Sequence, residues 1–409
     1  MLGLTSVCVF LFSALALAVT SGYSFGALAL LLASTCLLWK RPRLNLQRRD
    51  YLMLGTLLLY FLIFTANMLY HGDPARELDM PLRALLAMPV LLLLLAYPPR
   101  PGAWWSGLAI GAITGAALAA TQFIPSSPFR PQAATSNAIH YGNVSMLFGM
   151  LTLCGFEWAI KQRHRIAWSV LLLAGGFIGI FGSIISGSRG GWLALPVCGC
   201  IFFVHYARSR GKHNMTGLLT VLLAVAVLSY ALPNSPVLER ATDAVEDLKK
   251  FEDSDNVSTS VGQRLEMWRT ALTLSDDHIW LGMGRNGYLD AKKELSAEGK
   301  MSEIVLHYTN AHNDYIDSLV KRGIFGLLAL LLLFLLPLTL FARALLRSTP
   351  CSPAICAGRR GTVHLLYDFW PDDKLANLEH WHHHAGLPDG DAVGHAAPAR
   401  THCLSSFFA

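Results

Sequence analysis

The sequence predicts an all-α protein, a polytopic transmembrane helical bundle of about ten spans that carries one mostly helical domain outside the membrane. Hydrophobic residues make up 53% of the 409 residues and charged residues only 15%, too little polar surface for a water-soluble protein of this size. The apolar residues fall into blocks long enough for a helix to cross roughly 30 Å of hydrocarbon. The short connections between blocks are alternately rich and poor in Lys and Arg, as expected for loops on opposite sides of a membrane.

The apolar blocks predict ten spans, at residues 5–20, 24–39, 51–70, 82–97, 104–123, 138–160, 167–186, 190–206, 216–232 and 323–346. The first block is Ala-rich, like a signal peptide. No basic residue precedes it and further spans follow, so a retained helix is expected. Residues 1–232 therefore hold spans one to nine, and residues 323–347 hold span ten.

The basic residues gather in the connections that follow the second, fourth, sixth and eighth spans, at 40–49, 100, 161–165 and 208–212. These loops are predicted to be cytoplasmic, because Lys and Arg resist translocation. The long segment 233–322 follows the ninth span and is placed on the outer side. The net charge of +6 thus reflects topology, and nucleic acid is not expected as a partner, since no aromatic residues interleave the basic ones.

The outer segment 233–322 is predicted to be mostly helical. Helical spacing covers 236–251, a second helix begins near Ser260, and three glycines at 282, 284 and 287 predict a turn. A third helical stretch covers 288–297. A further helix is expected to start after Asn310 and to run into the last span.

The tail 348–409 is rich in His, Pro and Gly, and no span can be drawn in it. Two interpretations stay open: a genuine cytoplasmic tail, or a frameshift or truncation that replaced further membrane helices. The group His380, His382, His383 and His384 lacks the paired spacing of a structural zinc site. Most cysteines lie in predicted spans, and segment 233–322 contains none, so no disulfide framework is expected.

The motif Ser-Gly-Ser-Arg-Gly-Gly-Trp at 186–192 forms the tight connection between the seventh and eighth predicted spans. It holds Arg189 at the membrane surface, on the predicted outer side of the bundle. Its glycines allow close backbone approach there. Exposed amides and a guanidinium together suit a phosphate anion. The alternative is a turn whose arginine reaches towards lipid head groups.

A second motif places Arg264 and Trp268 one helical turn apart, with Arg269 beside them. A guanidinium next to an aromatic ring suits pyrophosphate or sugar recognition. An ordinary amphipathic helix with a solvated Arg and a core Trp is the competing interpretation.

A third motif, Asn-Ala-His-Asn-Asp-Tyr at 310–315, lies at the mouth of the last predicted span. Histidine is the side chain best suited to accept a proton near neutral pH, so His312 is a candidate general base. An N-terminal helix cap with a satisfied His is the competing interpretation. Asp253 and Asp255 copy the spacing of a metal-binding acidic pair but lie in a polar linker, and no metal is expected.

Together these motifs resemble the O-antigen ligase and polymerase superfamily of glycosyltransferases. The resemblance covers residues about 130–330 in order and interval, including the segment Asn-Ala-Ile-His-Tyr-Gly at 137–142 before the sixth span and the downstream Gly323 and Gly326. The C-terminus departs from the family, in which about two more spans would be expected.

The resemblance implies a metal-independent, inverting transfer of a glycan from undecaprenyl pyrophosphate to lipid A-core, at the periplasmic face of the bacterial inner membrane and without a cofactor. Its partners would be the undecaprenyl-pyrophosphate-linked glycan, the lipid A-core acceptor and membrane lipids. Arg189 and Arg264 would neutralise the leaving pyrophosphate, and His312 would activate the acceptor hydroxyl. The implied substrate-binding residues are His140, Trp268, Arg269, Gly282, Gly284, Asn313 and Tyr315.

Three other functions compete with this prediction. An O-antigen or exopolysaccharide polymerase uses similar lipid donors, but the single large outer loop favours a ligase. A protein O-oligosaccharyltransferase would differ in its acceptor. A transporter or flippase would place ionisable residues inside the spans, whereas the predicted spans are nearly free of charge.

Overall fold

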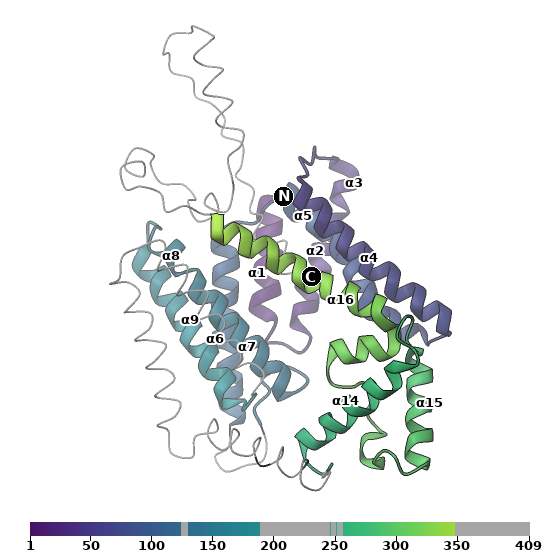
Figure 1. The fold of residues 1–409 in the computed structure, drawn as a ribbon. Helices are drawn as coiled ribbons and strands as arrows, with labels where there is room; N and C mark the ends of the chain where they lie inside the picture. The colour runs from purple at the N-terminus through teal and green to yellow at the C-terminus, as the bar shows by residue number, and fades with distance from the viewer. Residues whose placement is uncertain (124–129, 189–245, 247–250, 252–256, 348–409) are drawn as a thin grey trace. The chain divides into compact units, whose positions relative to one another are not determined.

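The computed structural model describes the chain except for residues 124–129, 189–245, 247–250, 252–256 and 348–409 (Figure 1). The described part is helical and contains no strand, as predicted. The predicted spans 190–206 and 216–232, almost all of the predicted helix 236–251, and the tail lie outside the described residues. The chain divides into two compact units, which we describe separately.

The first unit contains residues 1–30, the described part of 93–224, and the end of α16 from residue 340. Its helices are α1 (Leu2–Leu15), α2 (Gly22–Ser34), α6 (Pro101–Gln122), α7 (Ala138–Cys154), α8 (Phe156–Ala159) and α9 (Arg165–Ile185). Small residues let these helices pack closely, as is typical in membranes. A Cβ on Gly111 of α6 would lie 2.3 Å from the Ser13 carbonyl oxygen of α1. Ser145 of α7 donates a hydrogen bond of 2.8 Å to the Gly179 carbonyl of α9.

Two predicted spans are divided in the structure. The predicted span 138–160 is interrupted at Gly155, which caps α7 before the short α8 begins. The predicted span 24–39 is interrupted at Thr35, between α2 and α3 (Cys36–Lys40). The Thr35 hydroxyl donates a hydrogen bond to the Leu32 carbonyl oxygen. Such a bond from a side chain to the backbone competes with the helical hydrogen-bond pattern.

The second unit contains residues 31–92 and the described part of 225–339. After α3 come α4 (Arg48–His71), η1 (Ala75–Leu78), α5 (Asp79–Ala96), α14 (Ser260–Asp276), α15 (Gly284–Ala297), η2 (Glu303–Val305) and α16 (Asp314–Arg347). The predicted starts of a helix near Ser260 and of a helix after Asn310 are confirmed by α14 and α16. The predicted turn at 281–287 is shorter than expected, because α15 already begins at Gly284.

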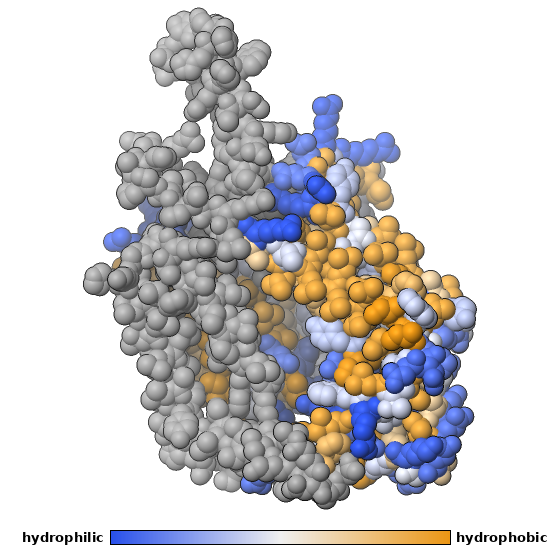
Figure 2. Space-filling model, viewed as in Figure 1, coloured by the Kyte–Doolittle hydropathy of each residue, from blue (hydrophilic) through white to orange (hydrophobic). Residues whose placement is uncertain are grey.

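Among the residues that the structure describes, six helical segments are long and apolar enough to cross a membrane: Gly22–Lys40, Arg48–His71, Ala75–Ala96, Pro101–Gln122, Arg165–Ile185 and Asp314–Arg343. The chain is therefore a multi-pass membrane protein. Residues 2–15 form a shorter apolar helix. On the face shown in Figure 2, hydrophobic residues cover the region of α4 and α16, and hydrophilic residues gather over α15.

A charged network attaches α15 to the C-terminal end of α4. Gly72 ends α4 in the left-handed conformation, and the Asp73 carboxylate then accepts hydrogen bonds from the backbone N–H groups of Arg285 and Asn286. The Glu77 carboxylate of η1 forms two ion pairs, each of 3.0 Å, one with Arg285 and one with Arg322 of α16. An acidic residue at the N-terminus of α15 also complements the helix dipole. This network therefore connects α15 and α16, which adjoin the candidate site, to the segment that follows α4.

The interior of this unit is formed where α14, α15 and the start of α16 meet (Figure 1). Its fully buried residues are Ala271, Tyr288, Ala311 and Val320. A second cluster of Met267, Met301 and Val305 lies beneath η2. Trp268 packs against both clusters, so it joins α14 to the segment that leads into α16.

Candidate functional site

The candidate site is centred on His312, in the segment between η2 and α16. Its backbone has φ of +52°, a left-handed conformation that is uncommon for residues other than glycine. Its ring makes an edge contact with Tyr308, with centroids 5.0 Å apart. Tyr308 in turn donates a hydrogen bond of 2.9 Å to the Gln263 amide oxygen of α14.

Arg264 lies close enough to His312 for their charges to interact. Partial burial lowers the pKa of His312, and the positive charge of Arg264 lowers this pKa further. The Asp317 carboxylate opposes both effects, and Lys292 adds a smaller lowering. A lowered pKa keeps the imidazole neutral near pH 7, the state in which it can accept a proton. Arg264 and His312, two of the three predicted catalytic residues, thus both lie in the second unit, and their catalytic roles stay a prediction.

Trp268 contributes to this site through the backbone of its neighbour. Its indole Nε1 donates a hydrogen bond of 2.9 Å to the carbonyl oxygen of Ala311, and its ring is half-buried between the two clusters. The contacts that the structure describes for Trp268 are with other residues of the protein. They agree with the interpretation of Trp268 as a core residue of an amphipathic helix. Stacking on a sugar stays a prediction.

Asn313 and Tyr315 begin α16. The Asn313 side-chain oxygen accepts hydrogen bonds from the backbone N–H groups of Tyr315 and Ile316, the pattern of an N-terminal cap. The motif at 310–315 therefore forms the helix cap that was one of the two interpretations of the sequence, while the role of the exposed His312 as general base stays a prediction. Tyr315 is exposed.

Gly282 and Gly284 allow the loop before α15 to pack closely against neighbouring segments. Both have φ of +69°, and a Cβ on Gly282 would lie 2.3 Å from the Lys321 carbonyl carbon. A Cβ on Gly284 would lie 2.6 Å from Cβ of His71 in α4. The close approach lets the Met283 N–H donate to the Val320 carbonyl at 3.0 Å. These glycines place the loop before α15 against α16, and contact with substrate stays a prediction.

Arg269 is exposed and forms an ion pair of 2.6 Å with the buried Glu266. Its guanidinium also lies 5.8 Å from the centroid of the Phe251 ring. Arg264 is also exposed, and its positive charge lowers the pKa of His312.

The other predicted site residues belong to the first unit. His140 is exposed in the first turn of α7, and its backbone N–H donates to the Asn137 side chain at 2.7 Å. Ser188 donates to the Asn143 side chain at 2.9 Å, so the segments around 137–143 and 186–188 lie side by side. Arg189 itself, like Asp253 and Asp255, lies outside the described residues.

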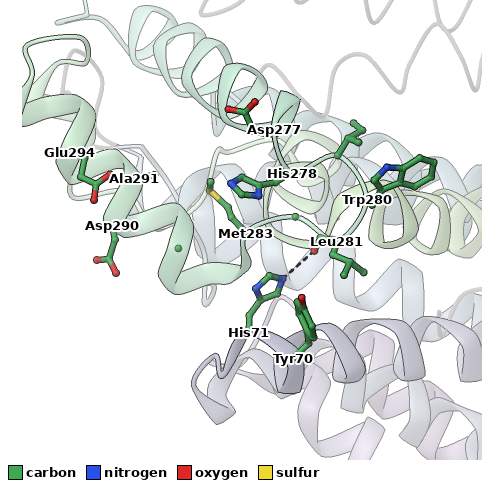
Figure 3. A pocket seen from close by; sticks show the side chains of 13 residues that line it. Tyr70, His71, Asp277, His278, Trp280, Leu281, Met283, Asp290, Ala291 and Glu294 are labelled. Atoms are coloured by element: carbon green, nitrogen blue, oxygen red, sulfur yellow. Dashed lines mark hydrogen bonds between the residues drawn. The ribbon is translucent and has the colours of Figure 1, made fainter.

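A pocket of about 740 Å³ opens on another side of the second unit, between the end of α4 and the start of α15 (Figure 3). The loop from Asp277 to Met283 forms one wall, and a ring nitrogen of His71 lies 3.2 Å from the Leu281 carbonyl oxygen. Three carboxylates, those of Asp277, Asp290 and Glu294, line it. Asp290 forms an ion pair of 2.7 Å with Lys293, and the residues that line the pocket include no Lys or Arg.

Two residues that the sequence did not single out, Lys292 of α15 and Lys321 of α16, lie buried beneath the His312 segment. Each donates hydrogen bonds to backbone carbonyls of that segment. No sequence signal distinguished Lys292 from Lys293 beside it, which is exposed. Within the described ranges, no three His, Cys, Asp or Glu side chains are grouped so that they could hold a metal ion.

Comparison with known proteins gives three matches. The O-antigen ligase family matches residues 174–331, which include α14, α15 and His312. An uncharacterized protein of Haemophilus influenzae is 26% identical over 88% of this chain and 90% of its own length. The O-antigen ligase of Escherichia coli K12 is 24% identical over 46% of this chain and 44% of its own length. The family match over residues 174–331 and the similarity to this ligase support a relationship of the chain to the O-antigen ligase superfamily.

Proposed function

We propose that the protein is an O-antigen ligase, which transfers a glycan from undecaprenyl pyrophosphate to a sugar of lipid A-core on the periplasmic side of the bacterial inner membrane. The observation that carries this proposal is that the exposed Arg264 and the exposed His312 lie in the same unit, with Arg264 near enough for its positive charge to lower the pKa of His312. A glycosyl transfer from a pyrophosphate donor needs both functions, a proton acceptor and positive charge at the leaving group.

In the proposed reaction, His312 takes the proton of an acceptor hydroxyl as its oxygen attacks the anomeric carbon of the donor. The bond between that carbon and the pyrophosphate oxygen breaks on the opposite face, so the configuration inverts. The bonding electrons leave with undecaprenyl pyrophosphate, and Arg264 and Arg189 offset the charge that develops there. The low dielectric near the membrane strengthens such interactions.

The charges within the second unit favour one place for the donor. The pocket in Figure 3 is lined by Asp277, Asp290 and Glu294, which would repel a pyrophosphate. Arg264 is exposed and offers a guanidinium that can bind phosphate oxygens in a fork. We therefore assign the donor pyrophosphate to the surface of α14 that carries Arg264, and not to the pocket.

Deleting the gene and resolving lipopolysaccharide on a gel tests the function directly. For a ligase, the polymer ladder disappears while lipid-linked polymer accumulates. Lipid A-core that carries a single repeat would indicate a polymerase instead. An unchanged ladder together with loss of glycan from a secreted protein would indicate a protein O-oligosaccharyltransferase.

A further inference from the structure

Lys292 is a fully buried lysine whose ammonium group binds backbone. It is 1% exposed, and its Nζ donates hydrogen bonds of 2.7 Å to the Val305 carbonyl and 2.8 Å to the Tyr308 carbonyl. Burial, together with the positive charge of Lys321, lowers the pKa of Lys292 to about 8. A buried ammonium group is costly unless its donors are satisfied, and here the bonds are made to the segment before His312.

Lys321 of α16 binds the next part of the same segment. It is 2% exposed, and its Nζ lies 3.0 Å from the Thr309 carbonyl oxygen and 3.0 Å from the Asn310 side-chain oxygen. Asp317 accepts a third bond at 2.8 Å. The Nζ atoms of Lys321 and Lys292 each lie 5.6 Å from the centroid of the Tyr288 ring, so the two cations share one aromatic ring.

The two backbone groups of Ala311, at the end of the segment, are also bound by side chains. The Ala311 N–H donates to the Asp317 carboxylate at 3.0 Å, and the Ala311 carbonyl accepts the bond from Trp268. Helices α14, α15 and α16 therefore each contribute a side chain that holds the chain leading into His312. Such bonds can maintain a left-handed backbone at His312 that local sequence does not favour.

Stability alone gives no reason for this arrangement. Two lysines with a single carboxylate between them repel each other, and apolar side chains of similar volume commonly fill such space at lower cost. We propose that Lys292 and Lys321 are positioning residues. They hold the segment 305–311 in place and thereby orient His312 near Arg264. This inference rests on the proposed function, because it assigns the lysines to the histidine that accepts the proton.

The test is a double-mutant cycle in the purified full chain, with lipid-linked donor and lipid A-core. Lys292→Met should lower kcat roughly 10- to 100-fold, as misplacement of a catalytic group does, with little change in KM for the donor. Lys292→Gln should recover part of kcat, because its amide still donates. The matched control is Lys293→Met, which removes a neighbouring lysine whose side chain is 70% exposed and should leave kcat within about twofold.

The His312→Ala background separates positioning from general stability. If Lys292 acts through His312, Lys292→Met causes no further loss there, and the coupling equals the whole effect of the single variant. Additive losses would overturn the proposal, as would a failure of both Lys292 variants to fold, since either result makes the lysine structural. Wild-type turnover in His312→Ala would instead refute the proposed role of His312, and the positioning role with it. The same cycle with Lys321→Met tests the second lysine.

Discussion

The indole N–H of Trp268 donates a hydrogen bond to the carbonyl oxygen of Ala311, the residue directly before His312. These two residues are 43 positions apart, and the bond joins the middle of α14 to the segment that enters α16. Ala311 is fully buried, and the indole of Trp268 is the partner that the structure shows for its carbonyl oxygen. The orientation of His312 relative to Arg264 therefore depends on a tryptophan that need not touch substrate.

Replacing Trp268 by Phe should lower both stability and turnover. The ring packing is largely kept, but a buried carbonyl loses its partner, which costs about 1–3 kcal/mol. We expect roughly a tenfold fall in kcat from the displaced histidine. Thermal unfolding and transfer assays in detergent measure the two effects. Trp280→Phe is the matched control, because Trp280 is 67% exposed. Equal results for the two variants would show that the indole N–H has no role.

The backbone contact at Gly282 predicts a large loss of stability in Gly282→Ala. An alanine there must adopt φ of +69° and also meet the Lys321 carbonyl carbon at 2.3 Å. Gly299→Ala separates these effects, since Gly299 has φ of +70° and nothing lies within 4 Å of a Cβ there. We expect Gly299→Ala to cost about 1–2 kcal/mol and Gly282→Ala roughly 1–3 kcal/mol more. If both variants unfold at the same temperature, the close approach of the loop to α16 is not as described.

The sequence predicted most of the helices because hydropathy and turn residues report local preference. Asn313 is a good example, since a side-chain cap is a short-range feature, and the start of α14 near Ser260 is another. The breaks at Thr35 and Gly155 were missed because an apolar block reads the same whether one helix or two fill it.

The site was predictable only in part, because its remaining features depend on contacts between distant segments. Lys292 and Lys293 are neighbours with the same side chain, yet one is buried and the other exposed. Only the packing of α15 against η2 and α16 decides which faces inward. The bond from Trp268 to Ala311 is equally invisible in the sequence, where the ring was expected to meet either the core or a sugar. Arg264 and His312 were predicted to act together; the charge of Arg264 lowers the pKa of His312, and their joint role in catalysis stays a prediction.

Reporter fusions test the proposed orientation of the site. A fusion at residue 280, in the loop between α14 and α15, should be active only with a periplasmic reporter, because the basic loops place the other side in the cytoplasm. Fusions after Lys161 and Arg208 should show the cytoplasmic pattern. A cytoplasmic signal at residue 280 would reverse the topology and remove the periplasmic site.

Transfer should continue in the presence of a chelator. Two arginines can supply the positive charge that a divalent cation supplies in other transferases. We expect EDTA to leave turnover of the purified protein within about twofold of the untreated value, and added magnesium or manganese to have no effect. Loss of activity with EDTA and rescue by either metal would transfer the role to Asp253 and Asp255.

Replacing Arg264 by Gln should change the pH dependence of turnover as well as its size. His312 must be neutral to accept a proton, so turnover falls as the pH drops through the pKa of His312. The positive charge of Arg264 lowers that pKa. Removing the charge raises the pKa, and the acid limb of the kcat profile should move to higher pH. Turnover itself should fall roughly 10²-fold or more, as when a group that stabilises a developing charge is lost.

Arg264→Lys and Arg269→Gln complete this test. Lysine keeps the charge but loses the forked geometry, so turnover should fall while the acid limb stays where it is in the wild type. Arg269→Gln removes a charge that is paired with Glu266 and should leave the position of the acid limb unchanged. The other charges that act on His312, those of Asp317 and Lys292, are present in all three variants. An acid limb that stays fixed in Arg264→Gln, or moves to lower pH, would show that Arg264 does not tune His312, and the base would have to be sought among other groups.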